Sequence, residues 1–569
     1  MSLFDDILRG RGLTDPQTRE AFLRPAYDAT RHDPFLLPDM EAAVARLEKA
    51  RQKQEHITIY GDYDIDGLTA TSLLLDAFSS FGFEKVEAFI PNRFVEGYGM
   101  TVDAVERIAA TGASLIVTVD CGSLSEKEII RARELGVDVI VTDHHNVAPV
   151  QPPAVAVINP KRLLKDHPDA YENFILKKEP SSNSDIPYAK LYPFVDLPGV
   201  GVAFKLVQAL QTRLSGLKDG QEKWLLDLVA LGTVCDVVTL RDENRMHVYW
   251  GLQVLAKTRR PGLLALMDVA GVNPREVNAR SLGFALGPRM NAAGRLETAT
   301  LALNMLTATD DASALEAAYV LDEMNTKRRR EQDKILKEAL VLAEQFADDP
   351  VLVVSAPGWN HGIIGIVAAK LLERFKKPTY VLEEMGEEAK GSARSYGDFS
   401  AADAIRAADD IITKGGGHKL AAGVTMPTAH IAAFRERVNK FYRDQQLEIA
   451  RQQQLLLPSP DAQAKFADVS EDIVIEISQL EPFGNGNPQP VLYSENLQVI
   501  HVRQMGAENQ HLKLALRDPT GTMELVSFNA PAHFFVEPGD VINAWYQPDI
   551  NEWQGRRSVQ GMLSHLERL

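Results

Sequence analysis

Short apolar stretches alternate with helix-like segments over residues 56–160. Three of these stretches end in polar clusters, which read ITIYGDYDID at 57–66, LIVTVDCG at 115–122 and VDVIVTDHH at 137–145. The stretches are rich in β-branched residues, and the intervening segments are long enough to be crossover helices, so the pattern predicts a parallel sheet. We therefore expect an α/β fold for this part of the chain.

The same reading divides the whole chain into six segments. We expect an N-terminal helical segment at 1–55, an α/β domain at 56–309, a connecting helix at 310–347, a second, smaller α/β domain at 348–430, a helical connector at 431–464 and a β-barrel at 465–569. Turns such as DPTGT and EPGD separate the last strands, as is typical of a small all-β barrel. Residues 161–192 are polar, with Pro and Ser clustered at 180–184, and we interpret them as a surface insertion.

Composition narrows the class of protein. With 569 residues, 45% hydrophobic and 24% charged, the chain has the composition of a globular protein of roughly three or four domains. No apolar run approaches the roughly 18 residues that cross a bilayer, so we expect no membrane partner. Two cysteines exclude a disulfide framework and favour the reducing cytoplasm. The net charge of −17 argues against a broadly basic surface, so a nucleic-acid substrate must be argued from sites.

The polar clusters predict a metal centre. Ligands gather at the carboxyl ends of parallel strands, where a topological switch opens a crevice. The residues expected to converge there are Asp62, Asp64, Asp66, Asp120, Asp143, His144 and His145. Oxygen ligands with one or two imidazoles suit Mn²⁺ or Mg²⁺ better than a structural zinc. The interpretation from the residues is a two-metal phosphoester hydrolase.

Each cluster also has a simpler interpretation. DxDxD at 62–66 is also the composition of a turn, but three acids crowded between a strand and a helix repel one another unless a cation neutralises them. Asp120 stands where a helix cap is common. A fourth candidate, Asp236, follows a buried-looking run, where an unpaired carboxylate is costly, whereas Asp227 fits a helix start.

The two cysteines, Cys121 and Cys235, directly follow and precede two of these aspartates. We interpret them as small buried fillers, with a thiolate role in redox control or metal capture as the alternative.

Several Gly- and Arg-rich segments are typical of phosphate binding. Arginine is the side chain best shaped for bidentate contact with phosphate. The candidates are Arg93 in PNRFVEGYGM, Arg289, Asn291 and Arg295 in GPRMNAAGR, Ser392 and Arg394 in GSARS, and His418 in GGGHKLAAG. Each segment alone is equally consistent with a turn or a helix-packing motif. Together with a metal centre they favour phosphodiester binding.

The motifs resemble those of a known superfamily. DYDIDG, VDCG, DHH and GTVCDVV resemble the four motifs of the DHH phosphoesterases. GPRMNAAGR, WNHGIIGIVAAKL, GSARS, GGHKLAAG and LEPFGNGNPQP resemble the bacterial RecJ family, the single-strand-specific 5′→3′ DNA exonucleases, from about residue 40 to near the C-terminus. One position departs from the family, which often has Trp-His where this chain has Trp359–Asn360, with His361 next.

The resemblance implies a fold and a set of functional residues. It implies a parallel-sheet DHH domain, a smaller DHH-associated α/β domain beyond a long helix, and a C-terminal OB-fold-like barrel. The implied metal ligands are Asp62, Asp64, Asp66, Asp120, His144 and Asp236, and the implied catalytic residues are Asp66, Asp120, His145 and Arg295. Arg93, Arg289, Asn291, Arg295, Ser392, Arg394 and His418 are expected to bind the substrate. The expected reaction is two-metal hydrolysis of single-stranded DNA to 5′-mononucleotides with Mn²⁺ or Mg²⁺, Asp120 bridging the ions, in DNA repair and recombination.

The family also implies partners, and two rival functions remain. The expected partners are a single-strand-binding protein and a RecQ-type helicase, and the chain is expected to be a monomer.

A rival enzyme would cleave short oligonucleotides, cyclic dinucleotides or pyrophosphate, and would need no third domain. A rival of another class is a non-catalytic single-strand-binding scaffold, which loss of the acidic ligands would mark. Every acidic ligand is present here, so we favour the exonuclease.

Overall fold

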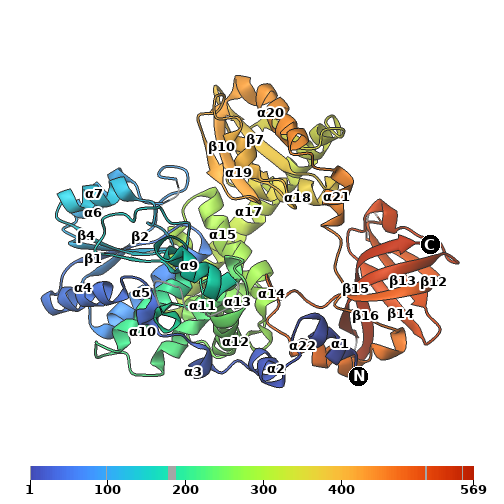
Figure 1. The fold of residues 1–569 in the computed structure, drawn as a ribbon, viewed down its shortest axis with the longest axis horizontal. Coiled ribbons are helices and arrows are strands. Elements are labelled where there is room, and N and C mark those ends of the chain that lie inside the picture. Colours follow the sequence, from blue (N-terminus) through green and yellow to red (C-terminus); the bar gives the residue numbers. More distant parts are fainter. Residues whose placement is uncertain (1, 98, 177–186, 507–508, 554) are drawn as a thin grey trace. The chain divides into compact units, whose positions relative to one another are not determined.

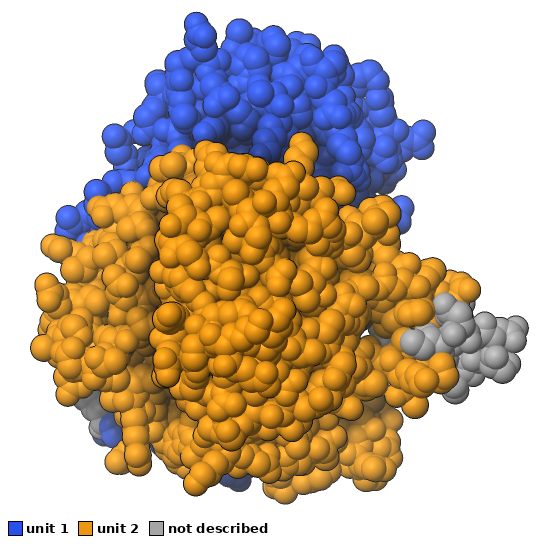
Figure 2. All heavy atoms as spheres, turned by 90° about the vertical axis from the view of Figure 1, so that its left-hand side faces the viewer, with its two compact units in different colours: residues 1–7, 326–474, 490–569 blue, residues 8–325, 475–489 orange. Residues whose placement is uncertain are grey.

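The computed structural model describes residues 2–97, 99–176, 187–506, 509–553 and 555–569 (Figure 1). The chain divides into two compact units (Figure 2). Unit 1 comprises residues 1–7, 326–474 and 490–569, and unit 2 comprises residues 8–325 and 475–489.

A five-stranded parallel sheet forms the centre of unit 2. Its strands are β1 (Ile57–Tyr60), β2 (Val86–Phe89), β3 (Leu115–Val119), β4 (Asp138–Thr142) and β5 (Ala156–Ile158), in the spatial order β2-β1-β3-β4-β5. The chain passes from β1 to its neighbour β2 and then crosses to the other neighbour, β3. The direction of winding therefore reverses between β1 and β3, which makes the carboxyl ends of these two strands the switch point of the sheet.

Both faces of this sheet are buried. Along β3, Leu115 and Val117 belong to one apolar core, whereas Ile116 belongs to another. Strands that are apolar on both faces are typical of parallel sheets covered by helices on both sides. Helices α6 (Val102–Ala110) and α7 (Glu126–Glu134) contribute to the smaller core, and α4 (Met40–Lys53), α5 (Ile65–Phe81), α10 (Gly199–Gln211) and α11 (Leu226–Cys235) contribute to the larger one.

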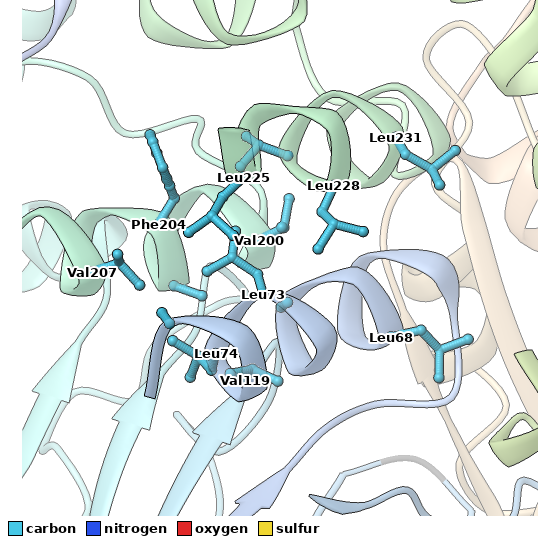
Figure 3. Close-up of a cluster of buried hydrophobic side chains, with 14 of the residues drawn as sticks. Leu68, Leu73, Leu74, Val119, Val200, Phe204, Val207, Leu225, Leu228 and Leu231 are labelled. Carbon is cyan, nitrogen blue, oxygen red and sulfur yellow. The ribbon is translucent and has the colours of Figure 1, made fainter. Parts of the chain in front are cut away.

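The larger core fixes the helices that lead to the switch point. Figure 3 shows leucines of α5 and α11 packed against Val200, Phe204 and Val207 of α10. The spacing of these three positions places them on one face of α10. Each such side chain contributes roughly 1.5–3 kcal/mol when it is fully buried. The packing therefore holds the starts of α5 and α10 and the end of α11.

Short helices complete unit 2. They are α2 (Pro16–Leu23), α3 (Tyr27–Thr30), α8 (Leu163–Asp166), α9 (Pro168–Ala170), α12 (Asp242–Leu255), α13 (Pro261–Val269), α14 (Ala279–Ser281), α15 (Gly287–Leu296) and α16 (Thr300–Leu306). Part of the predicted insertion at 161–192 is anchored, because Leu163, Ala170 and Leu191 are buried in a small cluster of their own. Residues 177–186 of that insertion lie outside the described residues.

The long helix α17 (Asp311–Glu344) leads from unit 2 into a second, mixed sheet in unit 1. The strands are β6 (Leu352–Pro357), β7 (Thr379–Met385), β8 (Glu388–Arg394), β9 (Lys414–Gly417) and β10 (Ala421–Pro427), in the order β6-β7-β8-β10-β9. Only β6 and β7 are parallel to each other. Helices α18 (Ile364–Phe375) and α19 (Ala401–Arg406) belong to this α/β domain.

The segment predicted as one helical connector differs from the expectation. It contains two helices, α20 (Ile431–Asp444) and α21 (Ile449–Gln454), with Gln446 between them at a φ of 53°. Phe434, Val438 and Tyr442 recur on one face of α20 and are buried in the core of the second sheet. Helix α20 is therefore part of the second α/β domain, because its apolar stripe needs that sheet to cover it.

A closed barrel forms the C-terminal part of unit 1. Its strands are β12 (Leu492–Met505), β13 (His511–Arg517), β14 (Thr522–Ser527), β15 (Val541–Trp553) and β16 (Arg556–Arg568), and β12 also pairs with β15 to close the ring. The short strand β11 (Ala462–Gln463) pairs with β12, and the chain also contains the helices α1 (Leu3–Gly10) and α22 (Glu471–Ser478). The predicted fold class, two α/β domains and an OB-like barrel, is confirmed. Over the described residues, every helix is too short or too polar to cross a bilayer.

Candidate metal centre

The turn after β1 carries three of the predicted acids. Asp64 caps α5, because its side chain accepts the backbone N–H of Gly67 at 3.1 Å. Asp66 lies in the first turn of α5, and Asp62 is only 2% exposed. A Cβ atom on Gly67 would stand 2.6 Å from the backbone nitrogen of Asp62, so glycine is needed for the helix to start this close to the turn.

Asp66 is held by the start of another helix. Its two carboxylate oxygens accept the backbone N–H groups of Gly199 at 2.6 Å and Val200 at 2.8 Å, at the N-terminus of α10. On the side of α11, a Cβ atom on Gly232 would stand 3.1 Å from Asp66 Oδ1. Burial, and then the charge of Asp64, raises the pKa of Asp66 to about 7 despite the two backbone donors.

Asp120 follows β3 on the other side of the switch point. Its φ of 61° is in the left-handed region, where residues other than glycine are uncommon and often functional. The side chain is 1% exposed, and a Cβ atom on Gly199 would stand 2.6 Å from its Cβ. Burial, and then the negative charge of Asp66, raises the pKa of Asp120 well above its ordinary value.

The two histidines after β4 differ in their surroundings. His144 Nε2 lies 3.1 Å from Asp120 Oδ1, 3.8 Å from Asp66 Oδ2 and 3.7 Å from Asp236 Oδ2. Burial lowers the pKa of His144 to about 3, so its imidazole is neutral, the form that binds metal ions. His145 Nδ1 lies 2.9 Å from Asp143 Oδ1 and 3.7 Å from Asp120 Oδ1.

Asp143 lies beside the two histidines and has a structural role that the sequence did not indicate. Its carboxylate accepts the backbone N–H groups of Ser123, His144 and His145, at 2.9, 2.7 and 3.0 Å. Burial alone would raise the pKa of Asp143, but the hydrogen bonds and the charge of His145 lower it well below the ordinary value. The structure therefore uses Asp143 to fix the His144–His145 loop. Sequence reasoning missed this role, as it missed the donors at Gly199 and Val200.

Asp236 completes the cluster from the C-terminal end of α11. Burial, and then the charges of Asp66 and Asp64, raises its pKa to about 9. Its competitor, Asp227, lies at the opposite end of α11, where it accepts hydrogen bonds from Thr258 and Arg260 at 3.0 and 2.9 Å. Asp227 is therefore satisfied within the protein, and Asp236 is the residue that reaches the cluster.

The donor set fits divalent cations. Three groups have ligand atoms within 4.8 Å of one another: Asp62, Asp64 and Asp120; Asp66, His144 and Asp236; and Asp120, His144 and His145. Four buried atoms in these groups make no hydrogen bond: Asp62 Oδ1, Asp120 Oδ1, His144 Nε2 and Asp236 Oδ2. Unpaired buried oxygens crowded together are costly without a cation, and carboxylates with imidazole suit Mn²⁺ or Mg²⁺. Because the groups share Asp120 and His144, the cluster has the composition of a two-ion site.

Comparison with known proteins places this centre in a family. The model of the DHH family N-terminal domain matches residues 56–233, that of the DHHA1 domain matches 348–444, and that of the RecJ OB domain matches 460–565. The chain is 37% identical over 566 residues to the single-stranded-DNA-specific exonuclease RecJ of Bacillus subtilis, covering 99% of this chain and 67% of the relative. It is 33% identical to that of Escherichia coli over 557 residues, covering 93% and 90%.

The chain belongs to the RecJ family. Among solved structures it resembles RecJ of Thermus thermophilus in complex with Mn²⁺, with a TM-score of 0.79, 28% identity and coverage of 99% of this chain and 75% of that one. It also resembles the Mg²⁺ complex of the same protein, with a TM-score of 0.73 and 26% identity over 99% and 74% of the two chains. The resemblance read from the motifs is therefore confirmed.

In this RecJ-family chain, the arginines of unit 2 that were predicted to bind phosphate are not equivalent. Arg289 is used internally, because its Nε donates to Asp322 Oδ1 at 2.8 Å and its Nη1 to the carbonyl of Ala285 at 2.8 Å. The Nε of Arg93, in contrast, is buried without a hydrogen-bond partner. Asn291 and Arg295 lie on α15, close to Gly294, where a Cβ atom would stand 3.0 Å from the carbonyl oxygen of Tyr63.

The other predicted phosphate ligands belong to unit 1. Ser392 and Arg394 lie on β8, and Arg394 Nη1 donates to Ser392 Oγ at 3.2 Å. A Cβ atom on Gly365, in the first turn of α18, would stand 2.9 Å from Ser392 Oγ and 3.1 Å from Arg394 Nη2, so glycine keeps this pair uncovered by the helix. His418 follows β9 and is exposed.

The position that departs from the family has a local explanation. Asn360 accepts the backbone N–H of Gly362 at 2.8 Å and so shapes the turn before α18. His361 lies beside Glu383, with 2.7 Å between its Nδ1 and Oε2 of the carboxylate. A histidine is thus held at this turn, one position later than in the family motif.

Both cysteines are free thiols. Cys121 is buried, with its Sγ 3.9 Å from the carbonyl oxygen of Tyr60, and the Sγ of Cys235 lies 3.7 Å from that of Leu282. Burial raises the pKa of both thiols, so neither is a thiolate in this structure. These surroundings favour the interpretation of small buried fillers.

Proposed function

We propose that this protein is a metal-dependent exonuclease that degrades single-stranded DNA 5′→3′ to 5′-mononucleotides. The observation that carries the proposal is the set of three carboxylate and histidine groups, linked to one another through Asp120 and His144, at the switch point of the sheet. Relatives that match nearly the whole chain carry the name single-stranded-DNA-specific exonuclease. The 5′→3′ direction comes from the family resemblance.

Six residues would hold two ions of Mn²⁺ or Mg²⁺. Asp62 and Asp64 would bind one ion, Asp66, His144 and Asp236 the other, and Asp120 both. When bound, the two ions would acidify the attacking water and neutralise charge on the phosphate. Asp62, Asp66, Asp120 and His144 are buried, and burial strengthens the charge interactions among them.

The remaining predicted site residues would handle the phosphodiester. Arg93 and Arg295 would bind its non-bridging oxygens, and His145, fixed by Asp143, would donate to the scissile phosphate. Ser392 and Arg394, with His418, would bind phosphate from the second α/β domain. We assign Arg289 to structural support and not to the substrate, because its guanidinium already binds Asp322.

The barrel favours a polymeric substrate over the small-molecule rival. OB-type barrels bind single strands by stacking and by backbone charge. Residues 458–569 contain seven Lys and Arg against fifteen Asp and Glu, so any DNA-binding groove must be confined to one face. The expected single-strand-binding protein, the RecQ-type helicase, the monomeric state and the cytoplasmic setting stay predictions.

The test is digestion of single-stranded DNA labelled at either end, with Mn²⁺. Early release of the 5′ label as a mononucleotide, absent on blunt duplex, supports the proposal. Asp120→Ala should abolish release, and Asp103→Ala, which removes an exposed aspartate of α6, should not. Survival of long strands with cleavage of dinucleotides or pyrophosphate would favour the small-substrate rival. Binding without any cleavage would favour the scaffold.

A further inference from the structure

An aromatic ring lies beneath the guanidinium of Arg93, next to the metal-binding groups. The guanidinium carbon of Arg93 is 4.2 Å from the centroid of the Tyr63 ring. Tyr63 stands between Asp62 and Asp64, which belong to one of the metal-binding groups. The sequence motif therefore places one aromatic side chain between two acidic ones, and that aromatic side chain contacts the loop after β2.

The ring face supports Arg93, and although the Tyr63 side chain also takes part in a hydrogen bond with Arg93, the Nε donor is left unbonded. A guanidinium stacked on an aromatic face is attracted by the ring, and its N–H groups stay available in its own plane. A carboxylate partner would occupy those N–H groups and neutralise the charge, as Asp322 does for Arg289. The buried, unbonded Nε of Arg93 shows a donor that the protein itself leaves unsatisfied. Such a donor beside a cation site is suited to an oxyanion.

The backbone on both sides of this contact is fixed by other residues. In the Arg93 loop, Asn92 Nδ2 donates to the carbonyl of Glu297 at 3.2 Å, and Asn92 Oδ1 accepts the N–H of Phe94 at 2.9 Å. On the other side, Gly294 of α15 packs against the carbonyl of Tyr63. The loop positions are thus set independently of the ring, and the ring is left to orient the guanidinium.

We propose that Tyr63 is a positioning residue that holds the Arg93 guanidinium toward a non-bridging oxygen of the phosphodiester at the metal centre. This inference rests on the proposed function and deepens it, because it names what orients one of the substrate-binding groups. The ring acts through Arg93 and does not contact the reacting atoms.

The test is a double-mutant cycle with Mn²⁺ and a 5′-phosphorylated oligothymidylate. Tyr63→Leu removes the ring and should raise KM roughly 5- to 30-fold, the range expected for a desolvated cation–π contact, with little change in kcat. Tyr63→Phe keeps the ring and should stay within about twofold of the wild type. In an Arg93→Gln background, Tyr63→Leu should add less than about twofold, because the group that the ring positions is gone.

Two controls separate positioning from a structural role. Calorimetric titration with Mn²⁺ should give the same stoichiometry and affinity for Tyr63→Leu as for the wild type. Tyr249→Leu, which removes a half-buried ring of α12 that contacts Trp250, should leave KM unchanged.

The outcomes are distinct. Loss of Mn²⁺ binding in Tyr63→Leu, or an equal KM defect in Tyr63→Phe, would overturn the inference, because the ring would then support the metal loop or act through its hydroxyl. If the wild type is active and Tyr63→Leu has an unchanged KM, the inference about Tyr63 is overturned and the proposed function stands. A wild type that releases no mononucleotide would remove the proposed function as well.

Discussion

The backbone N–H of Gly199 donates a 2.6 Å hydrogen bond to Asp66 Oδ2, which joins the first turn of α10 to the first turn of α5. The N–H of Val200 binds the other oxygen of the same carboxylate. The positive end of the α10 dipole thus faces a buried acid, and two donors that would otherwise be unsatisfied are used. This arrangement explains how Asp66 is tolerated as a buried carboxylate within its group with His144 and Asp236.

Gly199→Ala should weaken Mn²⁺ binding about 10- to 100-fold, the range typical of a lost supporting contact. The added methyl group would stand 2.6 Å from Asp120 Cβ, so either α10 or Asp120 must move. Calorimetric titration with Mn²⁺ measures the effect. Gly283→Ala is the matched control, because its methyl group would meet only Val234, at 3.7 Å. Equal affinities in the two variants would contradict the prediction.

Asp120→Asn should have opposite effects on stability with and without metal ions. In EDTA the substitution removes one of several crowded, buried negative charges, so the melting temperature should rise. In saturating Mn²⁺ the wild type gains about 2.7 kcal/mol at an ion concentration one hundred times the dissociation constant, and the variant gains less. Thermal unfolding in the two buffers measures both effects. A variant that melts below the wild type in EDTA would show that Asp120 stabilises the fold by itself.

Glu243→Gln should destabilise unit 2 in a pH-dependent way. Lys205 Nζ lies 2.8 Å from Glu243 Oε1, and both side chains are fully buried. Burial alone would raise the pKa of Glu243, but the charges of Lys205 and His247 lower it below 4.5. A lowered pKa means that the stabilisation is complete above the pKa of the unfolded chain and is lost as the pH falls through the folded value.

At pH 7 the loss of Glu243 should cost about 3–5 kcal/mol, because Lys205 is left buried without its partner. The difference from the wild type should shrink below about pH 4. Thermal unfolding at both pH values tests this. Glu41→Gln breaks an exposed pair with Arg213 and should cost less than about 1 kcal/mol. A pH-independent difference would mean that packing, and not the ion pair, is responsible.

Arg289→Gln and Arg93→Gln should have different effects. Arg289 supports Asp322 on α17, so its loss should lower stability by about 1–3 kcal/mol and leave KM for DNA within about twofold. Arg93→Gln should have the reverse effects: it should raise KM for DNA and change the melting temperature little. Asp322→Asn should reproduce the stability loss of Arg289→Gln. A large increase in KM for Arg289→Gln would contradict the structural assignment and would show that Arg289 binds the substrate.

Most of the metal centre could be predicted because its residues follow recognisable strands. β-branched runs ending in Asp62 or Asp120 identify strand ends, and the parallel order brings those ends together. The histidine pair after β4 follows the same rule. The order of strands and helices likewise gave the two α/β domains and the barrel.

The other features of the site depend on tertiary contacts that cannot be deduced from the amino-acid sequence. The donors to Asp66 are backbone N–H groups, so only the Pro-Gly-Val-Gly start of α10 hinted at them. Asp143 was expected only to lie near the other polar residues, and its hydrogen bonds to three backbone N–H groups and to His145 could not be foreseen. The sequence predicted that Arg289 binds phosphate, but its guanidinium donates to Asp322, which lies on a separate helix. Such pairings are decided by tertiary packing and not by local pattern.

The position of Asp236 at the very end of α11 has a consequence for biosynthesis. The sheet, the acids Asp62 to Asp120 and His144 leave the ribosome first, and Asp236 joins them only after α10 and α11 have been made. A truncated chain that stops at residue 233, where the match to the DHH family N-terminal domain ends, would contain the whole five-stranded parallel sheet but not Asp236, the proposed ligand. Ion capture by the group of Asp66, His144 and Asp236 would therefore have to wait until α11 has been made, and a chain released before that point would be left with uncompensated acids in its interior.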